Sequence, residues 1–274
     1  MTRFSPSLAK LAACLFAFAT LAATGQTPAP TATPAPPKKV PAVVAPPSLA
    51  APPPIPLNRT VIVLDPAHGG VDSGSRLSDN LLEKDVDLSF AYKLRSLLTA
   101  RGFNVILTRD SDAAQQPGSP GTALSLDDRA GIANHAHAVA CLLLHSTAAG
   151  NGVHLYSSEL EPTAGVASSV PWLNAQAAWV TQSQRMQKQL ASALTRAGLP
   201  LVSSRASVRP VDSLACPALV VELSRDGDDD ASLNDTDYQQ RVATAIAGAL
   251  VFWRDRAMPP ERLLPDTPAP GAQP

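Results

Sequence analysis

The chain has 274 residues, 45% of them hydrophobic, and its 22 basic and 23 acidic residues leave a net charge of −1. This balance provides no large basic surface, so we expect no nucleic-acid partner.

The first 25 residues predict a cleaved signal peptide. A basic start precedes an apolar run over residues 11–23, and small residues follow it. The run is shorter than the roughly 20 residues of a membrane span. We therefore expect a mature protein without a membrane span, periplasmic or secreted. A lipid anchor at Cys14 is the disfavoured alternative, because the apolar run lies mostly after this cysteine.

Residues 26–57 hold 12 of the 27 prolines of the chain. Proline fixes φ and removes a backbone donor, so this segment predicts a disordered, extended tether. A second proline-rich, disordered tail covers residues 259–274. Residues 58–258 remain, and they are enough for one domain with a sizeable core.

The domain begins with an apolar run at residues 61–64, which predicts a buried strand that Asp65 and Pro66 end. His68 and two glycines follow. Proteins of the α/β class place ligands and catalytic groups on loops at the carboxyl ends of such strands.

A helix is predicted from Glu83 to about Arg101, with apolar residues at spacings of three and four and acidic residues in its first turn. The apolar strand at residues 139–144 then leads directly into His145. A later buried strand, residues 215–223, carries Glu222 near its end. An unpaired carboxylate there would be costly, so we expect Glu222 to face a cation or water.

The remaining segments continue this alternation of strands and helices. It predicts an α/β fold, a three-layer sandwich with a mostly parallel central sheet flanked by helices. The further predicted elements are strands at residues 103–107 and 152–157 and helices that begin near Ser125, Leu173 and Asp237.

Four polar residues are thus expected near one edge of the sheet: His68, Glu83, His145 and Glu222. Two imidazoles and one carboxylate form a catalytic zinc set that leaves a position for water. The other carboxylate can then act as general base.

The motifs of the chain also resemble a known family. In order they read VIVLDPAHGG, LLEKDVDLS, LTRD, DDRAGIAN, LLLHS, GVHLYSS, PALVVELS and NDTDYQQRVATAIAGAL. Together they resemble the zinc-dependent N-acetylmuramoyl-L-alanine amidases of the bacterial cell-wall amidase family, from about Arg59 to Leu250.

The resemblance implies one Zn²⁺ ion held by His68, Glu83 and His145, with Glu222 as the catalytic residue. It implies hydrolysis of the amide between the lactyl group of N-acetylmuramic acid and L-alanine in peptidoglycan, for cell-wall remodelling or cell separation. The sequence does not identify an activating protein. Two alternatives stay open: a non-catalytic peptidoglycan-binding module, and another zinc amide hydrolase acting on cell-wall peptides or sugars.

The chain departs from the family pattern at three places. Ala67 replaces a usual glycine, residues 146–148 replace Ala-Asn-Ala after the second histidine, and residues 223–227 replace the segment after the glutamate. Because all four polar site residues remain, we expect changed specificity with catalysis retained.

Several residues outside this set also carry expectations. His154, on the strand after His145, is predicted to be solvated. Cys141 and Cys216 are interpreted as two buried, unpaired thiols, with a disulfide as the alternative. Residues 159–182 are a candidate lid over the site.

Overall fold

The computed structural model describes residues 57–112, 123–163, 170–227 and 233–257. The predicted signal peptide with Cys14, nearly all of the proline-rich tether and the proline-rich tail lie outside the described residues. In the part of the chain that the structure describes, no helix has the length and apolar character needed to cross a membrane.

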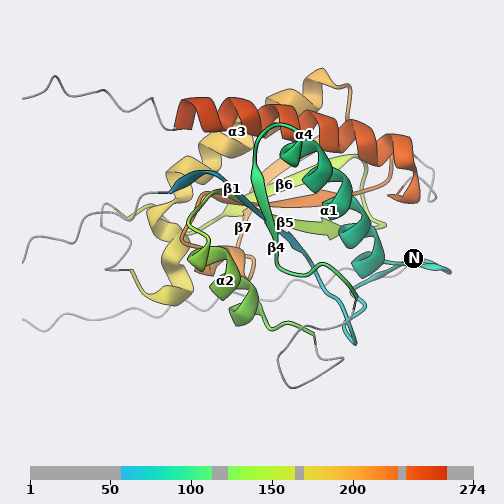
Figure 1. Ribbon diagram of the computed structural model, residues 1–274. Helices are drawn as coiled ribbons and strands as arrows, with labels where there is room; N and C mark the ends of the chain where they lie inside the picture. Colours follow the sequence, from blue (N-terminus) through green and yellow to red (C-terminus); the bar gives the residue numbers. More distant parts are fainter. Residues whose placement is uncertain (1–56, 113–122, 164–169, 228–232, 258–274) are drawn as a thin grey trace, which may run out of the picture. The chain divides into compact units, whose positions relative to one another are not determined.

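A six-stranded sheet forms the centre of the domain, with the strand order β4-β1-β5-β8-β6-β7 (Figure 1). Strands β4, β1, β5 and β8 run parallel, whereas β6 is antiparallel to β8 and parallel to β7. The predicted α/β fold with a mostly parallel sheet is therefore confirmed. The strands are β1 (Asn58–Pro66), β4 (Asn104–Leu107), β5 (Ala138–Ser146), β6 (Val153–Ser158), β7 (Leu201–Ala206) and β8 (Ala218–Leu223).

Helices cover both faces of the sheet, which explains why β1 and β5 are apolar along most of their length. One face packs against α1 (Glu83–Thr99), α3 (Val180–Arg196) and α4 (Thr236–Ala257). The other packs against α2 (Leu126–His135) and the short 3-10 helix η3 (Val211–Ser213). Figure 1 shows α4 and α2 on opposite sides of the sheet.

Alternate residues of the central strands enter the two cores, as the pleat of a strand requires. Ile62 and Leu64 of β1 lie in the core beneath α1 and α4. Val61 and Val63 lie in the smaller core on the side of α2. Since β1, β5 and β8 are parallel, their carboxyl ends meet at one edge of the sheet.

The sequence pattern does not predict three short or exposed elements. β7 is an edge strand whose residues are mostly exposed, so it lacks the apolar pattern of a buried strand. The strands β2 (Arg76–Ser78) and β3 (Leu81–Leu82) form a small antiparallel pair before α1. A pair this short has no periodicity that a sequence pattern can reveal.

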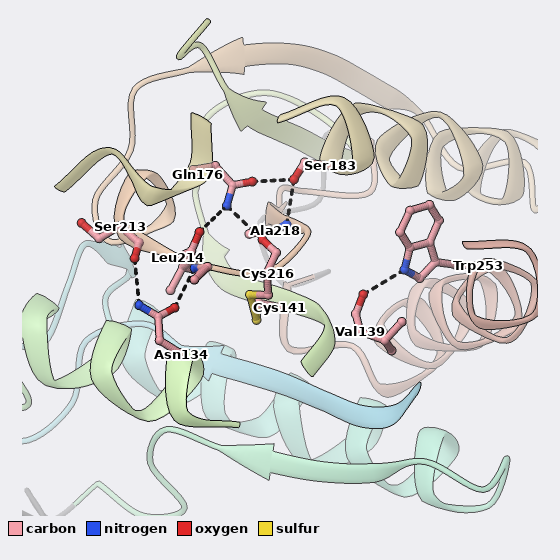
Figure 2. Close-up of a disulfide and its surroundings, with 11 residues drawn as sticks. Asn134, Val139, Cys141, Gln176, Ser183, Ser213, Leu214, Cys216, Ala218 and Trp253 are labelled. Carbon is pink, nitrogen blue, oxygen red and sulfur yellow. Dashed lines mark hydrogen bonds between the residues drawn. A yellow bond between two sulfur atoms is a disulfide. The ribbon is translucent and has the colours of Figure 1, made fainter. Parts of the chain in front are cut away.

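Cys141 and Cys216 form a disulfide, so the interpretation as two unpaired thiols is wrong. The bond joins β5 to the segment that leads into β8 (Figure 2). Side chains around it hold the same segment: Gln176 Nε2 donates to the carbonyls of Leu214 and Cys216, and the amide of Ala215 donates to Asn134. The start of β8 is therefore anchored on several sides.

The described residues of the candidate lid, 159–163 and 170–182, follow a strand that ends at the edge of the sheet opposite the site, so these residues do not cover it. β6 begins beside Leu223 at the end of β8 and runs back along it, so Ser158 ends at the opposite edge. The chain that follows includes the 3-10 helix η2 (Trp172–Ala178), which Gln176 fastens to the segment before β8. The antiparallel direction of β6, which the sequence did not reveal, accounts for the difference.

Candidate functional site

The fold brings His68, Glu83 and His145 together at the carboxyl edge of β1 and β5. One potential ligand atom from each residue lies within 4.8 Å of the others. Oε1 of Glu83 lies 2.8 Å from Nδ1 of His145 and 3.2 Å from Nε2 of His68. The two imidazole rings meet edge to face, with their centroids 5.4 Å apart.

His68 has a left-handed backbone conformation, with a φ of 59°, on the loop directly after β1. This conformation is rare for residues other than glycine and needs support from the surrounding structure. Gly69 and Gly70 continue it with positive φ, and Ala67 lies outside the left-handed segment. Alanine in place of the usual family glycine therefore fits here.

Two buried arginines hold this loop in place. Arg129 pairs with the Asp65 carboxylate at 2.6 Å and also donates to the carbonyls of Pro66 and His68. Arg109 donates to the carbonyls of Pro66 and Ala67. It also donates to the carbonyl of Lys84, the residue after Glu83 on α1. The guanidinium groups thus tie the His68 loop to the start of α1, so their role is structural.

The carboxylate of Asp72 orients the His68 ring. Its Oδ2 atom lies 2.9 Å from Nδ1 of His68, which leaves Nε2 directed at Glu83. A carboxylate behind the second nitrogen of a metal-binding imidazole is a common arrangement, because it fixes the tautomer and the ring plane.

Glu83 is buried at the first residue of α1, where its backbone amide donates to Ser75. Burial acts to raise the pKa of this carboxyl, but hydrogen bonds from His145 and His68 and from the amide of Ser75 outweigh it and hold the pKa well below its usual value. The Glu83 side chain also raises the pKa of His68. The group therefore holds a negative charge between two imidazoles.

Gly74 makes room for two of these side chains. A Cβ atom at this position would lie 2.6 Å from Cδ2 of His68 and 2.8 Å from Oε2 of Glu83. Only glycine fits against the pair. Two imidazole nitrogens and one carboxylate oxygen are also the donor set of catalytic zinc sites, so these residues fit a zinc ion.

Glu222 lies next to this group on β8. It is the register partner of His145 on one side and of His154 on the other, so the three side chains leave the same face of the sheet in a row. Its Oε2 atom lies 2.7 Å from Nδ1 of His154 and accepts a 3.3 Å hydrogen bond from the hydroxyl of Tyr156. The Glu222 side chain is 24% exposed, so it can meet a substrate.

His154 corrects one of the expectations. It is buried, not solvated, because the loop after β5 covers its ring, and it contacts Glu222. Sequence reasoning also missed Tyr156 and Asp72. The alternation of β6 places His154 and Tyr156 on one face, and Asp72 follows His68 by four residues, but neither signal says which side chain faces the site. His135 and His137 are exposed.

Two serines at positions where the chain departs from the family pattern make hydrogen bonds beside His145 and Glu222. The hydroxyl of Ser146, next to His145, donates to the buried Asp87 at 2.6 Å. The hydroxyl of Ser224 donates to the carbonyl of Ala149 at 2.7 Å. Both serines therefore hold the strand ends that carry His145 and Glu222.

Comparisons with known proteins identify the family of the chain. The family model described as N-acetylmuramoyl-L-alanine amidase matches residues 62–251. The germination-specific N-acetylmuramoyl-L-alanine amidase of Bacillus subtilis is 28% identical over 222 residues, which cover 76% of this chain and 85% of that protein. The probable cell wall amidase LytH of Staphylococcus epidermidis is 28% identical over 203 residues, and the match covers 71% of this chain and 58% of that protein.

Solved structures show the same fold. The catalytic domain of CwlV, an N-acetylmuramoyl-L-alanine amidase from Bacillus (Paenibacillus) polymyxa, superposes with a TM-score of 0.52 at 28% identity, covering 72% of this chain and 98% of that one. The CwlD amidase of Clostridioides difficile, solved in complex with the GerS lipoprotein, has a TM-score of 0.56 at 21% identity. The match covers 71% of this chain and 98% of that one. On the family match, which covers more than half of its length, the chain belongs to the N-acetylmuramoyl-L-alanine amidase family.

Proposed function

We propose that the domain at residues 58–258 is a zinc-dependent amidase that acts on peptidoglycan. It cleaves the amide between the lactyl group of N-acetylmuramic acid and the L-alanine of the stem peptide, for cell-wall remodelling or cell separation. The family match supports the substrate class. The donor set of His68, Glu83 and His145 supports the metal.

The three converging side chains would hold one Zn²⁺ ion, with Asp72 fixing the ring of His68. When bound, zinc supplies Lewis-acid activation of the amide carbonyl and of water. Glu83 keeps its negative charge because hydrogen bonds hold its pKa low, so it offers an anionic oxygen to a divalent cation without prior loss of a proton.

Glu222 would be the general base and then the general acid. As base it takes a proton from the attacking water, while a new C–O bond forms at the lactyl carbonyl carbon. As acid it returns this proton to the L-alanine nitrogen, and the C–N bond breaks. The position of Glu222, beside His145 in register and partly open to solvent, is the observation that carries this assignment.

We propose that the protein works outside the cytoplasm. The Cys141–Cys216 disulfide supports this location, because disulfides persist in oxidising compartments. The predicted signal peptide at residues 1–25 would direct the chain there, with cleavage leaving a periplasmic or secreted protein.

The test is digestion of purified sacculi by the zinc-loaded protein, followed by mass spectrometry of the soluble products. We expect intact stem peptides with a free L-alanine amino terminus and glycan strands without peptides. The Glu222→Gln variant keeps the shape of the side chain but removes the base. We expect this variant to bind one zinc per chain and to lose at least about 10²-fold in rate.

Other products would overturn the proposal in recognisable ways. Shortened stem peptides still attached to glycan indicate a carboxypeptidase, and loss of acetyl groups indicates a deacetylase. A protein that binds sacculi, takes up no zinc and releases nothing is a binding module. If Glu222→Gln cleaves as fast as the wild type, the role given to Glu222 is wrong.

A further inference from the structure

We propose that His154 is a positioning residue for Glu222, which holds one carboxylate oxygen so that the other is presented to the substrate. This inference rests on the proposed role of Glu222 as general base. Nδ1 of His154 lies 2.7 Å from Oε2 of Glu222. Among the described residues, hydrogen-bond donors reach Oε2 but not Oε1.

The sheet itself sets this contact. His154 and Glu222 are register partners on the antiparallel strands β6 and β8, so their side chains leave the same face side by side. His145 is the partner of Glu222 on the other side. Glu222 therefore lies between His145, which is one of the three candidate metal ligands, and His154, which is not.

The chemistry of the pair defines the tautomer of His154. An ionised carboxylate only accepts hydrogen bonds, so Nδ1 carries the proton that it donates to Glu222. Nε2 of His154 is buried and has no hydrogen-bond partner among the described residues. A proton on Nε2 would be a buried, unpaired N–H, which is costly, so the tautomer with its proton on Nδ1 is favoured.

The loop after β5 holds the ring in place from the side of Nε2. A Cβ atom on Gly150 would lie 2.6 Å from Cε1 and 2.8 Å from Nε2 of His154, so the glycine backbone lies directly against the ring. Ser224 and the hydroxyl of Tyr238 fasten this loop, through hydrogen bonds to the carbonyls of Ala149 and Gly152. The ring cannot turn away from Glu222 without moving this loop.

Tyr156 makes a weaker second contact with the same oxygen. Its hydroxyl donates to Oε2 of Glu222 at 3.3 Å, and its ring meets that of His154 edge to face. The tyrosine is half-buried, whereas His154 is 8% exposed. The histidine is therefore the better-fixed of the two donors.

The test compares three substitutions of His154 in the zinc-loaded protein. The side-chain nitrogen of asparagine is as many bonds from Cα as Nδ1 of histidine, whereas that of glutamine is one bond further out. We expect His154→Asn to keep kcat within about ten-fold of the wild type, and His154→Gln and His154→Leu to lose about 10²-fold. KM for a soluble muropeptide and the zinc content should stay unchanged in all three.

His135→Asn is the matched control, because His135 is exposed at the end of α2 and contacts only the carbonyl of Gly131 among the hydrogen bonds of the described residues. It should keep the wild-type kcat. Equal loss in His154→Asn and His154→Leu would reduce His154 to a packing residue and overturn the proposal. Loss of zinc in these variants would make His154 a metal ligand and also overturn it.

A second readout does not depend on activity. In protein labelled with ¹⁵N-histidine, NMR spectra should show His154 protonated at Nδ1, and this state should be lost in Glu222→Ala. Protonation at Nε2 instead would overturn the positioning role even in an active enzyme. A wild type that shows the Nδ1 proton but releases no stem peptides leaves the contact intact and refutes the proposed function.

Discussion

His145 and Glu222 are direct register partners on the parallel strands β5 and β8. Neighbouring strands of a sheet lie about 4.8 Å apart, so the two side chains leave the same face within one strand spacing of each other. The sheet thereby places the proposed general base beside a proposed metal ligand although 76 residues separate them in the sequence.

Replacing Asp72 by asparagine should weaken zinc binding. Asp72 contacts Nδ1 of His68 at 2.9 Å, and the neutral amide cannot accept its hydrogen bond as strongly. Loss of such a partner typically costs 10- to 100-fold in metal affinity, and we expect this range. Competition with a chelator measures it. An affinity equal to that of the wild type would contradict the orienting role of Asp72.

Replacing Arg129 by methionine should destabilise the domain by about 3–5 kcal/mol, because it leaves the buried Asp65 carboxylate without its cation. Urea denaturation measures the change. Arg209→Met is the matched control, since Arg209 pairs with Asp127 on the surface and its loss should cost at most about 1 kcal/mol. Equal effects of the two substitutions would show that the buried pair does not hold the His68 loop.

Replacing both Cys141 and Cys216 by alanine should lower the free energy of unfolding by about 4 kcal/mol, since the disulfide closes a loop of 75 residues. Reductant should destabilise the wild type to a similar degree and leave the double variant unaffected. We expect the folded variant to bind zinc normally, because the disulfide lies away from the edge that carries the ligands. A wild type insensitive to reductant would indicate that the disulfide does not form.

Asp87→Asn should change the pH dependence of stability of the metal-free protein. Burial raises the pKa of the Asp87 carboxyl well above its usual value, and the hydrogen bond from Ser146 opposes this only in part. The unfolded chain therefore releases this proton at lower pH than the folded one. The stabilising contribution of the protonated carboxyl is full below the unfolded pKa of about 3.9 and is lost as the pH rises through the folded pKa.

The slope of this loss is at most about 1.4 kcal/mol per pH unit. Asparagine does not titrate, so the difference in stability between Asp87→Asn and the wild type should grow in favour of the variant above about pH 4. Denaturation series between pH 4 and pH 8 measure it. Asp85→Asn, on the exposed side of the same helix turn, controls for removal of a charge from α1. A difference that is constant with pH would contradict a buried, protonated Asp87.

Much of the fold follows from the sequence because the central strands are covered on both faces. The runs that contain Val63 and Leu142 are apolar throughout and lead to His68 and His145, so the pattern predicts their place in the sheet. The sequence does not predict β7, because an edge strand with exposed serines lacks the apolar pattern of a buried strand. The direction of β6 also depends on tertiary pairing alone.

The residues of the candidate site also differ in whether the sequence predicts them. His68, Glu83 and His145 lie at element ends, where a polar side chain after an apolar run is conspicuous, and the fold brings them together. His154 lies inside a strand, and alternation cannot say which face a loop will cover. The Cys141–Cys216 pairing likewise depends on how the segment before β8 packs against β5, which no local pattern records.

The most direct measurement is the position of a bound ion. Crystals of the protein grown with one equivalent of zinc would be measured on both sides of the zinc absorption edge. We predict one anomalous peak in contact with His68, Glu83 and His145, and no such peak in the His145→Ala variant. Absence of a peak at these three side chains, or a peak only elsewhere, would contradict a zinc centre at this edge of the sheet.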